Sequence, residues 1–413
     1  MKILPLTDPA FKPYGRIVEG YPVDGILAAL ATCPCPENVA YVPKVDVLHA
    51  APDAENNYLT AQPDFAKGKT VREAWLAMLG DLNICSQKGM VERFDGTIGA
   101  STILAPYGGT FRESPNEAMA ALIPTDGETT TATLMSHGYD PYLSEWSPFH
   151  GAVYAVTESL AKICAAGGDV TRARLTFQEY FEKLGKDEKR WGKPAAALLG
   201  GLSAQLGFGT ASIGGKDSMS GTFLDNDVPP TLISFAIAPV NAGDVLTPEF
   251  KEAGHPVYLF GPVDESAGSL KAAWEAFHAL HKAGKVKAAW AVEHGIGEAV
   301  MKMSFGNEIG FAGDAAVGDN WHLPFYGFLV AELTEEVSFP GVMKIGQTTA
   351  DGVISLDGDS ATIDELYALN TATLEDVYPT KAKTSRDIPP TFNYEDKSTL
   401  APAIKVAKPK ILI

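Results

Sequence analysis

The stretch GAVYAVTESLAKICAAGG, residues 151–168, predicts the longest clear helix of the chain. Apolar side chains recur along it at helical spacing, and the Gly-Gly pair at its end is a common helix stop. The apolar stripe consists of Val153, Val156, Leu160 and Ile163.

Glu158 lies off this stripe, on the face that carries Ala155 and Lys162. Two interpretations remain open for its carboxylate. A Glu–Lys pair four residues apart on a solvated helix face contributes only about 0.2–0.5 kcal/mol. Alternatively, Glu158 points inward and binds a metal ion, since carboxylate oxygens are the ligands that Mg²⁺ prefers.

The elements around this helix indicate the fold class. Helices are predicted at about 70–82, 194–206 and 269–283, strands at 128–138, 230–240, 255–263 and 326–333, and a turn-rich segment at 293–306. Strands and helices alternate, but without the compact spacing of βαβ units. The predicted fold is therefore α+β, with helices packed over mixed sheets.

Composition excludes several classes of function. The 413 residues suffice for two or three domains, and 46% hydrophobic with 20% charged residues is ordinary for a globular protein. The net charge of −18 argues against a nucleic-acid or anionic-membrane partner. No apolar run approaches the ~20 residues of a membrane span. The 4 cysteines are too few for a disulfide framework, which favours a cytoplasmic protein.

The stretch IGGKDSMSG, residues 213–221, resembles a nucleotide-binding loop at first sight. A P-loop requires G-x-x-x-x-G-K-[ST], but Thr210 stands at the first glycine position and Asp217 follows the lysine. A P-loop is therefore excluded. Lys216 could still contact a phosphate oxygen and Asp217 could bind Mg²⁺. The alternative is a surface turn with a weak Lys–Asp ion pair.

Further carboxylates are scattered along the chain. Asp126 and Glu128 stand in PTDGETTTATLM, at an Asp-Gly turn before a predicted strand. No G-x-S-x-G motif marks a nucleophile. Dispersed carboxylates and glycine-rich turns with one lysine fit Mg-nucleotide binding, where catalysis consists of positioning and electrostatic stabilisation.

Three stretches carry a resemblance to a known family: DPYLSEWSPFHGAVYAVTESLAKICAAGGD (140–169), RLTFQEYFEKLGKDEKRWGKP (174–194) and IGGKDSMSGTFLDNDVPPTLISFA (213–236). Over about residues 56–400 the chain resembles phosphoribosylformylglycinamidine synthase, in the second, C-terminal half of its synthetase region. The resemblance implies an aminoimidazole ribonucleotide synthetase-like half.

The resemblance also implies a domain organisation. An N-terminal α/β sheet domain is expected over 56–240, a C-terminal sandwich domain over 241–380, and a linker with the start of a glutaminase domain over 381–413. Residues 1–55 do not resemble this family. Their opening is faintly similar to ureidoglycolate lyase-like, cupin-type proteins, which leaves a ureide-metabolism lyase as a third interpretation.

The family's reaction is the conversion of formylglycinamide ribonucleotide to formylglycinamidine ribonucleotide in purine biosynthesis, with ATP and with ammonia from glutamine. The resemblance places the ligands of Mg²⁺ and of ATP or ADP on Asp126 (or Glu128), Glu158 and Asp217, with Ser218 or Ser220 touching the nucleotide. Lys162 stands where the family often has asparagine. An ammonium cannot ligate Mg²⁺, so either one ligand is lost or Lys162 meets a phosphate directly.

The implied partners are a first synthetase half, in cis or in trans, and a glutaminase domain or subunit that releases ammonia. The first half's His-Asn-His-Pro segment and Gly-rich loop are not found in this sequence. The chain alone is therefore expected to be incomplete as a carbon–nitrogen ligase. The alternative function is a non-catalytic nucleotide-binding half that completes a partner's active site.

Overall fold

The computed structural model describes residues 58–59, 63–264, 266–314, 317, 321–356, 358–381, 390–393 and 395. The segment 1–55 with its faint cupin-type similarity lies outside these residues, as does most of the segment 381–413, where a linker and the start of a glutaminase domain are predicted. The chain divides into one unit that ends at Thr380 and a second that begins at Lys381. All elements below belong to the first unit.

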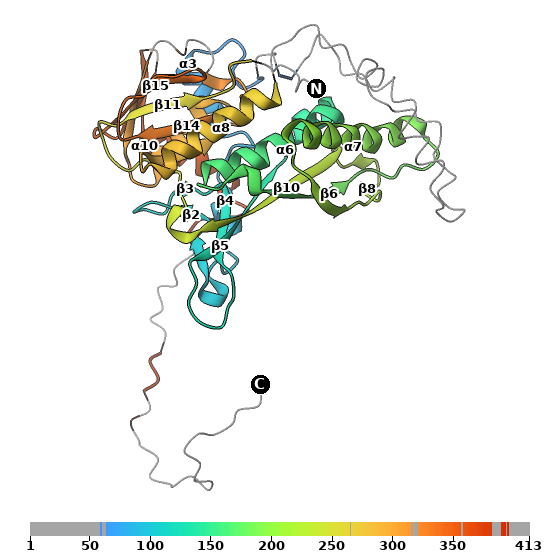
Figure 1. The fold of residues 1–413 in the computed structure, drawn as a ribbon, viewed down its shortest axis with the longest axis horizontal. Helices are drawn as coiled ribbons and strands as arrows, with labels where there is room; N and C mark the ends of the chain where they lie inside the picture. The colour runs from blue at the N-terminus through green and yellow to red at the C-terminus, as the bar shows by residue number, and fades with distance from the viewer. Residues whose placement is uncertain are drawn as a thin grey trace. The chain divides into compact units, whose positions relative to one another are not determined.

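The first sheet has six strands in the order β1-β4-β5-β10-β6-β7. Its strands are β1 (Thr102–Leu104), β4 (Ala118–Leu122), β5 (Thr131–Gly138), β10 (Thr231–Asn241), β6 (Arg174–Tyr180) and β7 (Ser212–Lys216). All neighbours are antiparallel except β6 and β7. Side chains of the central strand β10 alternate between buried and half-buried, because only one face of the sheet is covered by helices. Those helices are α6 (Pro148–Ala165) and α7 (Glu188–Phe208) (Figure 1).

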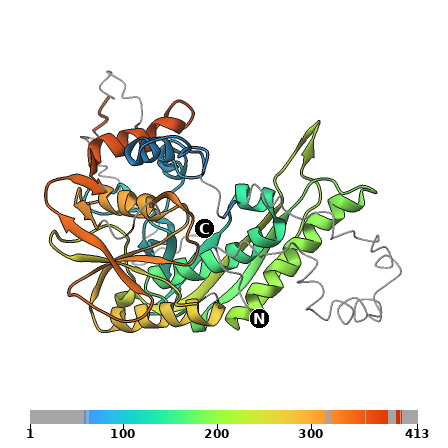
Figure 2. The same cartoon turned by 90° about the horizontal axis from the view of Figure 1, so that it is seen from above.

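The second sheet has seven strands in the order β12-β14-β11-β15-β13-β16-β17. They are β12 (Val286–Ala291), β14 (Leu329–Leu333), β11 (Pro256–Phe260), β15 (Val342–Thr349), β13 (Gly310–Gly313), β16 (Val353–Leu356) and β17 (Asp359–Thr362). Helix α8 (Ala267–Lys282) packs with one face of this sheet and with α6. Helices α3 (Val71–Leu79), α9 (Ile296–Phe305) and α10 (Ile363–Glu375) pack on the other face, and Figure 2 shows α3 beside α10.

Short elements complete the fold. They are the helices α4 (Lys88–Val91) and α5 (Pro141–Trp146), the 3₁₀ turns η2 (Ile98–Ala100), η3 (Val170–Arg172) and η4 (Ala242–Asp244), and the paired strands β2 (Tyr107–Gly108) with β3 (Ser114–Pro115) and β8 (Thr222–Phe223) with β9 (Asn226–Asp227). No helix among the described residues is long and apolar enough to cross a membrane. Mixed sheets covered by helices confirm the predicted α+β class. The domain boundaries at 240 and 380 stay predictions.

Two predicted elements differ from the structure. Every residue of α6 is buried, so the interpretation that places Glu158 on a solvated helix face is wrong. The helix contacts β5 and β10 of the first sheet and also β12 and α8, and these elements bury its polar side as well. The turn-rich segment predicted at 293–306 contains the buried helix α9. Gly295, at φ +125°, precedes that helix rather than interrupting it.

Candidate functional site

A group of charged side chains is buried where α6 meets the loop that follows β12. The Lys162 ammonium donates a hydrogen bond to Glu158 Oε1, and its Nζ lies 3.4 Å from Glu293 Oε2. The side chains of Glu158 and Lys162 are only 1% and 8% exposed. Glu158 Oε2 accepts the backbone N–H of Tyr139 at 3.1 Å. Both carboxylate oxygens of Glu158 are therefore occupied by partners within the chain.

Glu117, which precedes β4, adds a third carboxyl group. The backbone N–H of Ala291 donates to its Oε2 at 2.7 Å, which ties the first sheet to β12. Burial raises the pKa of Glu117 to about 8, although the Lys162 charge works in the opposite direction. The Lys162 ammonium is thus the nearby cation for carboxyl groups from three separate segments.

The electrostatic balance keeps Lys162 charged. Burial alone would lower the pKa of Lys162, but Glu158 and Glu293 outweigh it and hold that pKa above its ordinary value. Burial and the Glu293 charge raise the pKa of Glu158. Burial would also raise the pKa of Glu293, but Lys162 and His294 more than offset it and keep Glu293 ionised.

His294 extends this group toward the surface. Its Nε2 lies 3.2 Å from Glu293 Oε1, and its Nδ1 lies 3.9 Å from Asp140 Oδ2. Burial opposes the charged form, yet the carboxylates of Glu293, Glu298 and Asp140 raise the pKa of His294 to about 10. His294 is therefore an imidazolium at neutral pH. We call Glu117, Asp140, Glu158, Lys162, Glu293 and His294 the charge network.

Asp140 is the best-satisfied carboxylate of the charge network. It caps α5 by accepting the backbone N–H groups of Tyr142 and Leu143. Its Oδ1 also accepts from the Asn83 amide at 3.2 Å, and its Oδ2 accepts the hydroxyls of Tyr58 and Tyr326. This saturation holds the carboxylate in one position beside His294.

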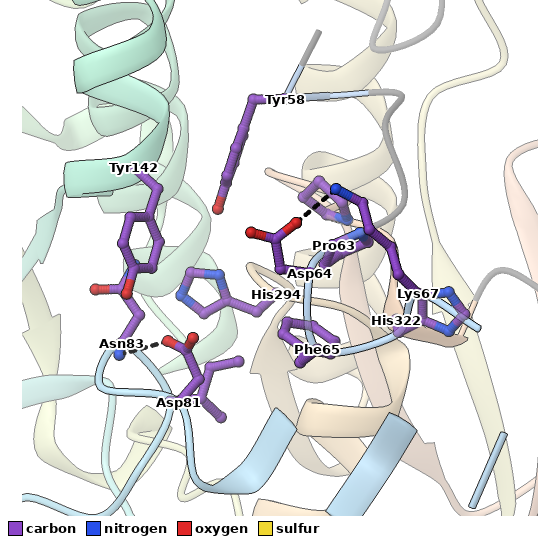
Figure 3. Close-up of a pocket in the computed structure, with 12 residues that line it drawn as sticks. Tyr58, Pro63, Asp64, Phe65, Lys67, Asp81, Asn83, Tyr142, His294 and His322 are labelled. Atoms are coloured by element: carbon purple, nitrogen blue, oxygen red, sulfur yellow. Dashed lines mark hydrogen bonds and ion pairs between the residues drawn. The ribbon is translucent and has the colours of Figure 1, made fainter. Parts of the chain in front are cut away.

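His294 lines a cavity of about 530 Å³ (Figure 3). The other lining residues are Tyr58, Pro63, Asp64, Phe65, Lys67, Asp81, Asn83, Ile84, Tyr142, His322 and Pro324. Figure 3 shows the imidazole of His294 between the carboxylates of Asp64 and Asp81, with Tyr58 and Tyr142 on the neighbouring walls. Asp64 pairs with Lys67 at 2.5 Å, and Asp81 Oδ1 accepts the backbone N–H of Asn83 at 2.8 Å.

The cavity combines features typical of small-molecule sites. Its volume falls within the ~300–1,000 Å³ range of such sites, and its walls mix aromatic rings with a few polar groups. The rings offer stacking surfaces, and the carboxylate of Asp81 can accept hydrogen bonds from hydroxyl or amino groups. The charge network supports this cavity from the interior side.

The structure does not bring the predicted metal ligands together in one site. Asp126 and Glu128 are exposed in the turn before β5, and Asp217 is exposed after β7. No hydrogen bond or ion pair between described residues joins Glu158 to Asp126 or Asp217. Within the described part of the chain, no group of three or more His, Cys, Asp or Glu residues could hold a metal ion. As it stands, Glu158 does not fit Mg²⁺, because it is inaccessible and Lys162 already neutralises it.

The stretch 213–221 forms an edge strand and its following loop. Lys216 and Asp217 are exposed, and no ion pair between them is found among the described residues. The Ser218 and Ser220 hydroxyls lie 2.9 Å apart. A Cβ atom at Gly215 would lie 2.4 Å from the Phe177 carbonyl oxygen, so this glycine permits the close pairing of β7 with β6. The nucleotide contacts of Lys216, Ser218 and Ser220 stay predictions.

Sequence reasoning missed most of the charge network. Glu293 and His294 follow the apolar run of β12, and such a polar pair directly after a buried strand is the signal that could have marked them. Glu179 on β6 was also missed. Glu179 is buried, and its Oε1 has no hydrogen-bond partner among the described residues. Burial together with Asp217 raises the pKa of Glu179 to about 7.

Comparison with known proteins adds to this description. No family model matches the chain. The PurL subunit of phosphoribosylformylglycinamidine synthase from Picrophilus torridus is 22% identical over 263 residues, which are 58% of this chain and 35% of that protein. The same subunit from Thermococcus sibiricus is 22% identical over 199 residues, 48% of this chain and 26% of that protein. The chain therefore spans about a quarter to a third of the length of these curated relatives.

Solved structures are similar to this chain at lower sequence identity. Thermotoga maritima PurL complexed with AMPPCP has a TM-score of 0.48 and 17% identity, over 70% of this chain and 44% of that one. Thiamine monophosphate kinase from Aquifex aeolicus has a TM-score of 0.41 and 12% identity, over 58% and 93%.

By fold and site, the chain is an α+β protein with a ligand-sized cavity backed by a buried charge network. In sequence it is similar to the PurL subunit of phosphoribosylformylglycinamidine synthase, which confirms the predicted resemblance.

Proposed function

We propose that this chain is a synthetase half of a phosphoribosylformylglycinamidine synthase. It acts in the ATP-dependent conversion of formylglycinamide ribonucleotide to formylglycinamidine ribonucleotide, with ammonia released from glutamine. The sequence similarity to PurL supports the reaction class. The structural observation that carries the proposal is the cavity beside His294, which suits a hydroxylated, phosphate-bearing ligand of nucleotide size.

The proposed chemistry has two balanced steps. The amide oxygen of the substrate attacks the γ-phosphorus of ATP and ADP leaves, which gives a phosphorylated imidate. Ammonia then attacks the imidate carbon, phosphate leaves with the C–O bond electrons, and one proton is released. Neither step requires a protein nucleophile, so the protein's contribution is positioning and charge stabilisation.

The residues of the cavity fit such roles. Tyr58 and Tyr142 offer ring surfaces against a base or sugar, and Asp81 accepts from hydroxyl groups. Lys67 lines the cavity, where a phosphate group could replace Asp64 as the ion-pair partner of the Lys67 ammonium. His294 supplies fixed positive charge rather than a transferable proton, because a pKa of about 10 keeps it protonated at neutral pH.

The proposal requires partners. A first synthetase half would complete the active site, and a glutaminase domain or subunit would supply ammonia. A cytoplasmic location and the use of Mg-ATP follow from the same proposal. The described residues do not assemble a magnesium site at Glu158, so no step above is assigned to a metal ion held there.

One observation favours the second candidate, a non-catalytic nucleotide-binding half. Lys162 neutralises the helical carboxylate that the resemblance assigns to metal binding. Calorimetric titration with Mg-ADP separates the two functions in part, since a structural site binds nucleotide tightly without hydrolysing ATP. Asp217→Ala should then lower the melting temperature only when nucleotide is present.

The decisive experiment measures formylglycinamidine ribonucleotide from ATP, ammonia and formylglycinamide ribonucleotide. We expect no product from the isolated chain and product after addition of a separately produced first synthetase half. Asp81→Asn should lower kcat/KM of the mixture by about tenfold, the value of one charged hydrogen bond. The control Glu336→Gln, at an exposed ion pair with Lys344, should leave it unchanged. Absence of product in the mixture, with no binding of substrate or ATP by the chain, would contradict the proposed function.

A further inference from the structure

Two buried helices of this chain carry the same Glu-x-x-x-Lys pair. Lys162 donates to Glu158 on α6, and Lys302 donates to Glu298 Oε1 at 2.6 Å on α9. In both pairs the second carboxylate oxygen accepts a backbone N–H, from Tyr139 and from His294 respectively. The two pairs are therefore equivalent in their local geometry.

Their wider surroundings differ. Lys302 has one carboxylate partner, and its Nζ lies 5.6 Å from the centre of the Trp290 ring. Lys162 faces Glu158 and Glu293 directly, and Glu117 acts on it electrostatically from the first sheet. These acidic groups come from three segments that are far apart in sequence.

Two carboxylates beside one interior point are expensive to bury without a cation. Oxygen atoms from Asp and Glu arranged around a single point are also the usual environment of Mg²⁺, Mn²⁺ or Ca²⁺. In this protein the point is occupied by the end of a lysine side chain that is 8% exposed. The ammonium contributes one positive charge and three donors where a divalent ion would contribute two charges.

We propose that the Lys162 ammonium is the resident cation of a site formed by Glu158 and Glu293, and that it takes the place of a divalent metal ion. Replacement of Lys162 by a neutral residue with an oxygen ligand converts the site into one that binds Mg²⁺ or Mn²⁺. The unmodified chain holds no metal at Glu158. Any magnesium that accompanies ATP in the proposed reaction is therefore held elsewhere.

The test uses Lys162→Asn, because asparagine is shorter and adds an amide oxygen. In the presence of EDTA the melting temperature of this variant should fall by roughly 5–10 °C relative to the unmodified chain, since a buried charge cluster loses its cation. Addition of Mn²⁺ without nucleotide should restore at least half of this loss. The melting temperature of the unmodified chain should change by less than about 1 °C.

Metal binding is measured directly by electron paramagnetic resonance of free Mn²⁺ at pH 8. Lys162→Asn should bind one equivalent, and the double variant Glu158→Gln with Lys162→Asn should bind at least tenfold more weakly. The matched control is Lys302→Asn. Among the described residues Lys302 pairs with one carboxylate, Glu298, whereas Lys162 pairs with two. It should lose stability in EDTA and gain no Mn²⁺ binding.

Two results would overturn the proposal. One is stoichiometric Mn²⁺ binding by the unmodified chain that disappears in Glu158→Gln. The other is a folded Lys162→Asn variant that binds no Mn²⁺. If Lys162→Asn does not fold in EDTA, refolding upon addition of Mn²⁺ supports the proposal, and failure to refold contradicts it. None of these readouts depends on turnover, so failure of the proposed ligase function leaves the inference standing, and the reverse also holds.

Discussion

The charge network and the loop 213–221 use similar residue types in opposite surroundings. In the network, Lys162 and Glu158 are buried, and the side chain of Glu293 is 17% exposed. In the loop, Lys216 and Asp217 are exposed. The same chemistry is therefore coupled to folding in the first region and left to solvent in the second. Burial, rather than the motif, decides which charges matter for stability.

The largest contrast is expected from removal of one lysine in each region. Lys162→Met should lower the free energy of unfolding by about 3–5 kcal/mol, because it leaves buried carboxylates without their cation. Lys216→Met should change it by less than about 0.5 kcal/mol, as for most exposed sites. Urea unfolding followed by circular dichroism measures both. Equal losses in the two variants would remove the distinction.

The next test concerns the glycine of the loop. Gly215→Ala should destabilise the protein by about 1–3 kcal/mol, because the new methyl group would meet the Phe177 carbonyl 2.4 Å away. The control Gly268→Ala lies in helix α8, where the nearest atom is 3.8 Å from the added Cβ, and should be neutral or slightly stabilising. Urea unfolding of both decides between a packing role and a purely ligand-binding role for Gly215.

A pH titration of stability tests the role of His294 in the charge network. The folded pKa of His294 is about 10, above its ordinary value near 6.5, so its contribution to stability is fully present below pH 6.5. This contribution is lost as pH rises from 6.5 through 10. His294→Gln should therefore be least stable relative to the unmodified chain at low pH, and the difference should shrink toward pH 10. His278→Gln on α8 is the control, and a parallel pH dependence in both variants would contradict the assignment.

The smallest effect on stability is expected at Glu179, on strand β6 beside the loop 213–221. Burial and Asp217 raise the folded pKa of Glu179 to about 7, so its contribution to stability is lost as pH rises from about 4.5 to 7. Glu179→Gln should remove this decline and match or exceed the stability of the unmodified chain at pH 8. Asp217→Asn should shift the decline to lower pH. Thermal unfolding between pH 4 and pH 8 records both, and a less stable Glu179→Gln variant at pH 8 would show that the ionised carboxylate is needed.

Sequence periodicity predicted the elements but not their full environment. The strand at 230–240 and the helix at 151–166 appear as β10 and α6 because local patterns of apolar residues determine them. The complete burial of α6 depends on β12 and α8, which follow it by more than a hundred positions in the sequence. Helix α9 was missed because its glycines were interpreted as turn signals.

The candidate site was less predictable than the fold. Glu158 was singled out, but its partner Glu293 lies 131 positions from Lys162, and no local pattern reveals such a pairing. The loop 213–221 attracted attention because glycines next to a lysine suggest phosphate binding. In the structure, Gly215 is explained by strand packing. Sequence spacing could not predict that charged residues far apart in the sequence are buried together.

The central claim is that Lys162 occupies the place of a metal ion. Anomalous diffraction from crystals soaked in Mn²⁺ tests it most directly, on the unmodified chain and on Lys162→Asn. The account predicts a Mn²⁺ peak between Glu158 and Glu293 in the variant only. A peak at Glu158 in the unmodified chain, with Lys162 displaced, would contradict it.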